Sequence, residues 1–206
     1  MALVKYNNNS LSAVTSAASF PAGAMTLIKT LTASSDSTIS FVDGSSDVVL
    51  DSTYPIYLFK YINCHPSAAS TLSFNGSIDT GSNYNVAKTS SSFYGLHKED
   101  DSSTALSYNV YQDLAQSTGF QNLTSASQIG TDNDCVTNGE LYLFNPSSTT
   151  FVKHYIANAN GSNAQSVNSY TAGYFNTTSA IDAIQFSMST GNIDAGTIKL
   201  YGIKDS

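Results

Sequence analysis

The chain contains no tryptophan and no arginine, and only 11% of its 206 residues are charged. Its eight basic residues are all lysines, none of them adjacent, and the formal net charge is −7. A nucleic-acid groove needs clustered cations that neutralise phosphates. The composition therefore argues against nucleic-acid binding, and it leaves Ser, Thr and Asn to make up most of the polar surface.

Long apolar runs are also missing. None approaches the roughly 18 residues that a membrane helix requires, and the N-terminal segment is too polar, with too short a central region, for a secretory signal. We therefore expect no membrane insertion and synthesis in a cytoplasm. The two cysteines, Cys64 and Cys135, stand apart without metal-ligand spacing, so we predict buried thiols instead of a disulfide.

No sequence motif for catalysis or for a bound cofactor occurs, so we predict a chain that is not an enzyme and needs neither cofactor nor metal. Paired carboxylates brought together by the fold stay possible on sequence grounds. On a strand, Cys64 and His65 would point to opposite faces and could not share an ion. The acidic segments that begin at Asp79, Glu99 and Gly130 offer oxygen ligands for calcium, but we interpret them as turns, which Asp and Asn cap.

Short apolar or alternating runs bounded by turn residues dominate the chain from Met25 onward, and each has the length of a strand. Nine are clear, at residues 25–33, 37–44, 54–63, 70–79, 139–148, 150–161, 170–176, 180–189 and 196–204. Residues 105–119 fit either a helix or a strand, and we favour a strand because of their β-formers. We predict an all-β fold: an antiparallel two-sheet sandwich, jelly-roll-like, with an immunoglobulin-like fold as the alternative.

Residues 1–22 differ from the rest because they are mainly small and polar, and we predict an N-terminal attachment arm followed by a sandwich domain at residues 23–206. The arm alone has too little apolar surface to offset the entropy of being fixed. We expect it to bind a partner, by strand addition for example. Its anchors would be Leu3, Val4, Tyr6, Leu11 and Val14.

Aromatic residues are plentiful, with 13 tyrosines and 10 phenylalanines. We expect every phenylalanine and about half of the tyrosines to fill the core. The remaining tyrosines, on a polar and nearly uncharged surface, suit either sugar stacking or a protein interface.

Several segments, in order, resemble a domain of structural proteins from tailed, especially marine, bacteriophages. They include "SFNGSIDTGSNYNVAKTSSSFYG", "GELYLFNPSSTTFVKHYI" and the ending "GNIDAGTIKLYGIK", and the resemblance covers about Met25 to Lys204. In that family the domain stands at the outer end of tail-fibre-like proteins or alone as a small virion protein. The resemblance implies a β-sandwich, a non-enzymatic role and a homotrimer.

The expected function is thus that of a structural protein on the virion surface, either as a capsid decoration or as the subunit of a short fibre. Its arm would contact other virion proteins of the capsid or tail. No coiled-coil or β-helical shaft precedes the domain here, which favours direct attachment to the particle. The alternative is a tail-fibre receptor-binding module that recognises a host glycan through exposed tyrosines.

Overall fold

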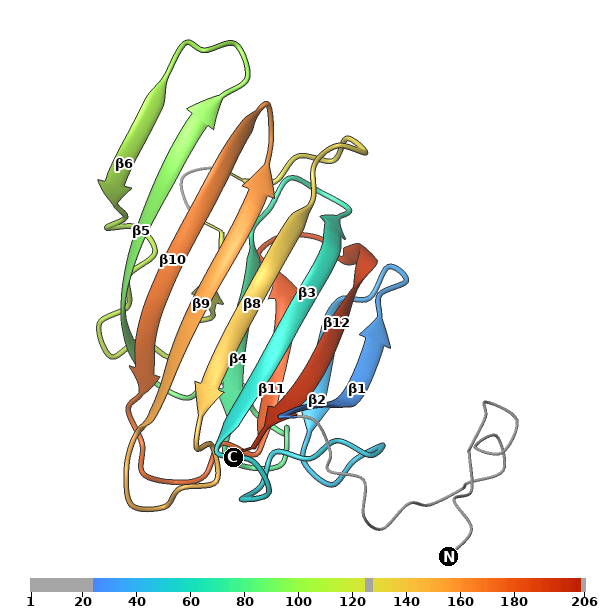
Figure 1. The fold of residues 1–206 in the computed structure, drawn as a ribbon, viewed down its shortest axis with the longest axis vertical. Helices are drawn as coiled ribbons and strands as arrows, with labels where there is room; N and C mark the ends of the chain where they lie inside the picture. Colours follow the sequence, from blue (N-terminus) through green and yellow to red (C-terminus); the bar gives the residue numbers. More distant parts are fainter. Residues whose placement is uncertain (1–23, 125–127, 205–206) are drawn as a thin grey trace, which may run out of the picture.

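The computed structural model describes residues 24–124 and 128–204, in which it contains twelve β-strands and no helix (Figure 1). The five predicted anchors of the arm lie outside the described residues. The strands are β1 (Met25–Thr32), β2 (Thr38–Val42), β3 (Ile56–Pro66), β4 (Leu72–Ser77), β5 (Lys88–Lys98), β6 (Thr104–Tyr108), β7 (Gln121–Asn122), β8 (Thr137–Phe144), β9 (Lys153–Ser162), β10 (Gln165–Phe175), β11 (Ala183–Met188) and β12 (Ile193–Ile203).

These strands form two antiparallel sheets that pack face to face. The larger sheet has eight strands in the order β1-β12-β3-β8-β9-β10-β5-β6, and the smaller has four in the order β2-β11-β4-β7. In Figure 1 the large sheet faces the reader and the small sheet lies behind it. The predicted all-β sandwich of jelly-roll-like form is confirmed.

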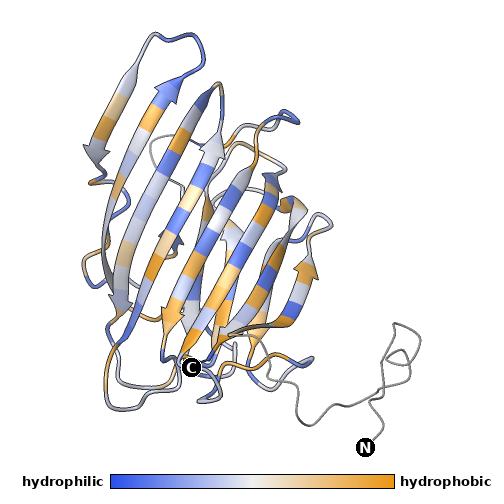
Figure 2. Ribbon diagram, in the orientation of Figure 1, coloured by the Kyte–Doolittle hydropathy of each residue, from blue (hydrophilic) through white to orange (hydrophobic). Residues whose placement is uncertain are grey.

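Burial alternates along the strands of the large sheet, as the two-residue period of a strand requires. In β9, for example, residues 153, 155, 157, 159 and 161 are buried while the residues between them are exposed or half-buried. β10 follows the same rule. Figure 2 shows the resulting stripes of apolar and polar residues across the sheet.

Aromatic rings occupy the centre of the core between the two sheets. Phe186 of β11 lies near Phe59 of β3, with ring centroids 5.5 Å apart, and Phe74 of β4 lies 5.1 Å from Tyr155 of β9. The prediction that every phenylalanine is buried is wrong, because Phe93 is 46% and Phe151 71% exposed. Among the described tyrosines only three are fully buried, fewer than the predicted half: Tyr57, Tyr61 and Tyr155.

The last strand, β12, lies inside the large sheet, hydrogen-bonded to β1 on one side and to β3 on the other. Its Ile198 and Leu200 are fully buried against the core, whereas Lys199 and Tyr201 face outward. At Gly196, where the pairing with β3 shifts, a Cβ would come within 2.7 Å of the Asn63 carbonyl oxygen. A glycine therefore permits the close approach of the two strands at this bulge.

Candidate functional site

The three histidines of the chain, the residue type most suited to metal and acid–base chemistry, are scattered. His65 lies on β3, His97 on β5 and His154 on β9. The acidic segments starting at Asp79, Glu99 and Gly130 are all in turns, as predicted. Asp79 shows why turns use such residues, because its Oδ1 accepts a hydrogen bond from the Asn83 backbone N–H at 2.9 Å.

In the part of the chain that the structure describes, no three His, Cys, Asp or Glu side chains are grouped so that they could hold a metal ion. Asp134 of the candidate calcium loop instead accepts a bond from the Cys135 thiol at 3.4 Å. Cys64 and Cys135 are both buried free thiols, as predicted. Burial raises the pKa of Cys64 to about 12, so this thiol is a poor nucleophile.

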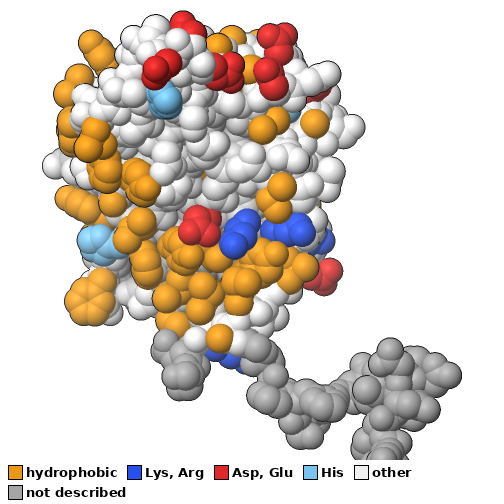
Figure 3. All heavy atoms as spheres, turned by 45° about the horizontal axis from the view of Figure 1, so that its top comes forward, with side chains coloured by type: hydrophobic (Ala, Val, Ile, Leu, Met, Phe, Trp, Pro, Cys, Tyr) orange, Lys and Arg blue, Asp and Glu red, His pale blue; other side chains and the backbone are white. Residues whose placement is uncertain are grey.

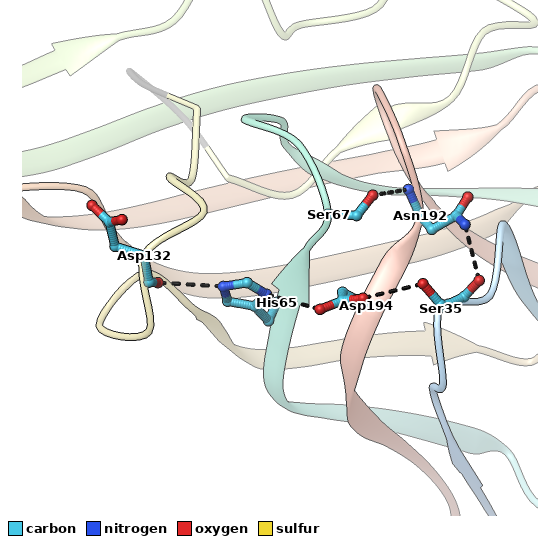
Figure 4. A network of polar contacts seen from close by, with 6 residues as sticks. All are labelled: Ser35, His65, Ser67, Asp132, Asn192 and Asp194. Atoms are coloured by element: carbon cyan, nitrogen blue, oxygen red, sulfur yellow. Dashed lines mark hydrogen bonds and ion pairs between the residues drawn. The ribbon is translucent and has the colours of Figure 1, made fainter.

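A polar network around His65 joins four segments at one end of the sandwich: the loop before β2, β3, the loop before β8, and β12 with the turn before it (Figure 4). His65 Nδ1 lies 3.8 Å from Asp194 Oδ2, and the Ser35 hydroxyl donates to the other oxygen of Asp194 at 3.1 Å. In a Ser-His-Asp triad the imidazole stands between the hydroxyl and the carboxylate. Here the carboxylate stands between them, so this network ties β3 and β12 to the loop before β2 and does not activate Ser35.

Two buried lysines, Lys88 and Lys153, are held by hydrogen bonds to neighbouring residues. Lys88 Nζ donates to Asn75 Oδ1 at 2.5 Å and to the Val86 carbonyl at 3.0 Å, and it lies 5.6 Å from the centre of the Phe175 ring. Burial lowers the pKa of Lys88 to about 7. Lys153 Nζ donates to three backbone carbonyls. The donors of Lys88 thus link β5 to β4 and to the preceding loop, and those of Lys153 hold loop carbonyls to the start of β9.

The outer face of the large sheet is the feature that stands out. An antiparallel sheet with one face on the core normally presents polar side chains on the other. Here directly paired residues form an apolar row that crosses six strands, from the edge strand β1 to β10. The row consists of Leu27, Tyr201, Leu58, Tyr142, Ile156 and Ala172.

A second row lies beside the first, toward the end of the sheet at which β1 begins. It consists of the directly paired residues Met25, Ile203, Ile56 and Phe144. We call these two rows the apolar band. Its members are Met25, Leu27, Ile56, Leu58, Tyr142, Phe144, Ile156, Ala172, Tyr201 and Ile203. Figure 3 shows hydrophobic side chains gathered on this face of the molecule.

The band combines exposed with shielded side chains. Met25, Leu27 and Ile156 are 48%, 51% and 53% exposed, whereas Leu58 is only 2% exposed although it points away from the core. Leu58 is flanked on the neighbouring strands by its register partners Tyr142 and Tyr201, whose side chains are larger. Beside Ile156 and Ala172, a shallow depression of about 610 Å³ is bordered by His154 and Tyr174. The surface of the band is therefore uneven, and several of its apolar side chains are exposed.

A row that begins with charged residues borders the band on the side away from Met25. This row contains Lys199, Lys60 and Glu140, and the last two approach to 3.8 Å. Farther along the same row, Phe93 and Tyr170 stack with ring centroids 5.0 Å apart and 14° between the ring planes. Both rings are partly exposed, at 46% and 40%.

The sequence predicted exposed tyrosines but not where they would gather, because the band arises from register between strands far apart in the chain.

Comparison with family models, with curated proteins and with solved structures found no match. Among the described residues, no helix has the length and apolar character needed to cross a membrane.

Proposed function

We propose that this chain is a non-enzymatic structural protein on the surface of a tailed-phage virion, and that it is held there by protein contacts made through the apolar band. The band is the observation that carries the proposal. The virion setting comes from the resemblance of residues 25–204 to phage structural domains, and the band supplies a surface on which such a protein could be attached.

The chemistry of the band fits a protein neighbour. Contiguous exposed apolar patches mark interaction sites, and protein interfaces have an apolar centre enriched in aromatic residues with a polar rim. The band has Tyr142, Phe144 and Tyr201 in such a centre, while Lys60 and Glu140 stand at its border. Covering it removes apolar surface from water at a gain of about 25 cal/mol per Å² before the costs of association.

Purified phage particles that carry this gene test the proposal. Mass spectrometry should find the chain in the particles in stoichiometric amounts, and gold-labelled antibody should mark their surface on either the capsid or the tail. A chain that is expressed during infection but is absent from washed particles would contradict the proposal.

A second function is favoured by the stacked pair Phe93 and Tyr170. Its rings stack face to face on the outer side of the large sheet, and Asn168 donates to the Tyr170 hydroxyl at 2.7 Å. The outer face of a partly exposed ring with an uncharged amide beside it suits the face of a sugar ring. This alternative is a receptor-binding module for a host surface glycan.

A glycan array with the full chain separates the two functions. Saturable binding that is lost in Tyr170→Ala and kept in Ile156→Ser would support glycan recognition at the ring pair. Absence of binding to glycans of the host surface would leave the structural role as the better account.

A further inference from the structure

We propose that the apolar band receives residues 1–22 of a neighbouring copy of this chain, so that each copy is fastened to the next by its N-terminal arm. This inference rests on the proposed function, since it names the partner of the same surface. It depends on three features: where the arm joins the sheet, what the arm contains and how far it reaches.

The arm joins the sheet directly at the band. Ala24 precedes β1, and its carbonyl accepts a hydrogen bond from the Lys204 backbone N–H at 3.0 Å. The next residues, Met25 and Leu27, already belong to the band. The described chain therefore begins next to the apolar surface, and the arm is tied covalently to that point through residue 23.

Composition makes the arm a suitable cover for this surface. Its predicted anchors are apolar, small residues separate Tyr6, Leu11 and Val14 from one another, and the one charged side chain is Lys5. Such a segment can place single apolar side chains among the exposed ones of the band, such as Ile156, without burying a carboxylate. The anchors are Leu3, Val4, Tyr6, Leu11 and Val14.

Length permits the arm to cross the whole band. The six strands from β1 to β10 are separated by five spacings of about 4.8 Å, which gives a width of roughly 24 Å. An extended segment of 22 residues reaches up to about 75 Å. Enough chain is left to bridge the gap between two copies.

Geometry favours the neighbour over the copy that carries the arm. β1 enters the band at Met25 and leaves it after Leu27, so a chain that extended N-terminally from Ala24 along the line of β1 would leave the sheet at its end, beside Met25. To cover its own band, the arm would have to turn sharply back over Met25 at this point. A neighbouring copy can receive the arm without that turn.

Photo-crosslinking in the full chain tests the inference. A photoreactive amino acid replaces Leu11, and ¹⁴N- and ¹⁵N-labelled copies are mixed, allowed to exchange and illuminated. We expect crosslinks from residue 11 to peptides of β8 or β9. Crosslinks that join a ¹⁴N peptide to a ¹⁵N peptide should be at least half as abundant as crosslinks that join two peptides with the same label. Crosslinks only within one isotope would mean that the arm covers its own band, and crosslinks to other regions, or none, would equally overturn the inference.

Variants give the matched control. Tyr142→Ser combined with Ile156→Ser should reduce the mixed-isotope crosslinks at least tenfold. Leu106→Ser, which changes a residue that is 81% exposed but lies outside the band, should leave them unchanged. If the crosslinks form as expected and the chain is absent from particles, the virion proposal fails while the arm exchange stands.

Discussion

Phe186 packs against four aromatic rings in the middle of the core: Phe41, Phe59, Tyr61 and Phe74. Truncating a fully buried ring leaves a cavity, so we expect Phe186→Ala to lower the free energy of unfolding by about 3–5 kcal/mol. Phe151→Ala, at a residue that is 71% exposed, should change it by no more than about 0.5 kcal/mol. Urea unfolding measures both values, and equal losses would contradict the assigned core.

Lys88 gives the stability a defined pH dependence. Its folded-state pKa of about 7 lies below the ordinary value of 10.5, so the unfolded chain binds more protons between these values. The free energy of unfolding therefore rises with pH above 7. The Cys64 thiol acts in the opposite sense above about pH 9, because its pKa is raised from 9.0 to about 12.

The contribution of Lys88 is best measured between pH 7 and about pH 8.5, below the range in which an ordinary thiol is mainly ionised. Wild-type protein should gain thermal stability over this interval. Lys88→Met should lose that gain, and Lys60→Met, at a partly exposed lysine on the outer face, should keep it. The same pH slope in all three proteins would show that Lys88 is not the source.

At the scale of the element, β12 should be essential to folding. Deleting residues 196–206 removes the buried Ile198 and Leu200, leaves β1 without its partner and makes β3 an unpaired edge of the large sheet. Unpaired edges and lost apolar burial both favour aggregation. We expect insoluble protein on expression, and a soluble truncated chain that unfolds cooperatively would contradict the topology.

Most strands could be predicted from the sequence because their composition is strongly β-forming. All nine expected runs overlap a strand. β5 was missed because "KTSSSFYGLHK" is rich in serine and is held by pairing with β10 along its whole length. The prediction of a strand over residues 105–119 is right only for its start, in β6, since residues 109–119 form turns and irregular chain.

The apolar band could not be predicted in the same way. In "YPIYLFKYIN" both faces of the strand are apolar, so the alternation does not say whether Leu58 or Phe59 meets the core. That choice is made by the small sheet, which covers Phe59 and leaves Leu58 on the outer face. The rows of the band then follow from pairing between residues as distant as Leu27 and Tyr201.

For the molecule as a whole, we expect stability without a bound metal. The candidate carboxylates are engaged in turns: Asp79 accepts bonds from Asn83, and these bonds lower its pKa to about 2. Treatment with EDTA should therefore leave the melting temperature unchanged within error. A fall of several degrees, restored by calcium, would assign a site to the turn of Asp132 and Asp134.

The central claim is that the apolar band holds copies of this protein in an assembly, for which the resemblance implies a trimer. Sedimentation velocity of the full chain tests it most directly. Wild-type protein should sediment as the trimer. The control variant Leu106→Ser with Val110→Ser should do the same, because both residues are exposed and lie outside the band. Tyr142→Ser with Ile156→Ser should sediment as a folded monomer with an unchanged circular dichroism spectrum. A monomeric wild-type protein, or a band variant that still forms the trimer, would contradict the claim.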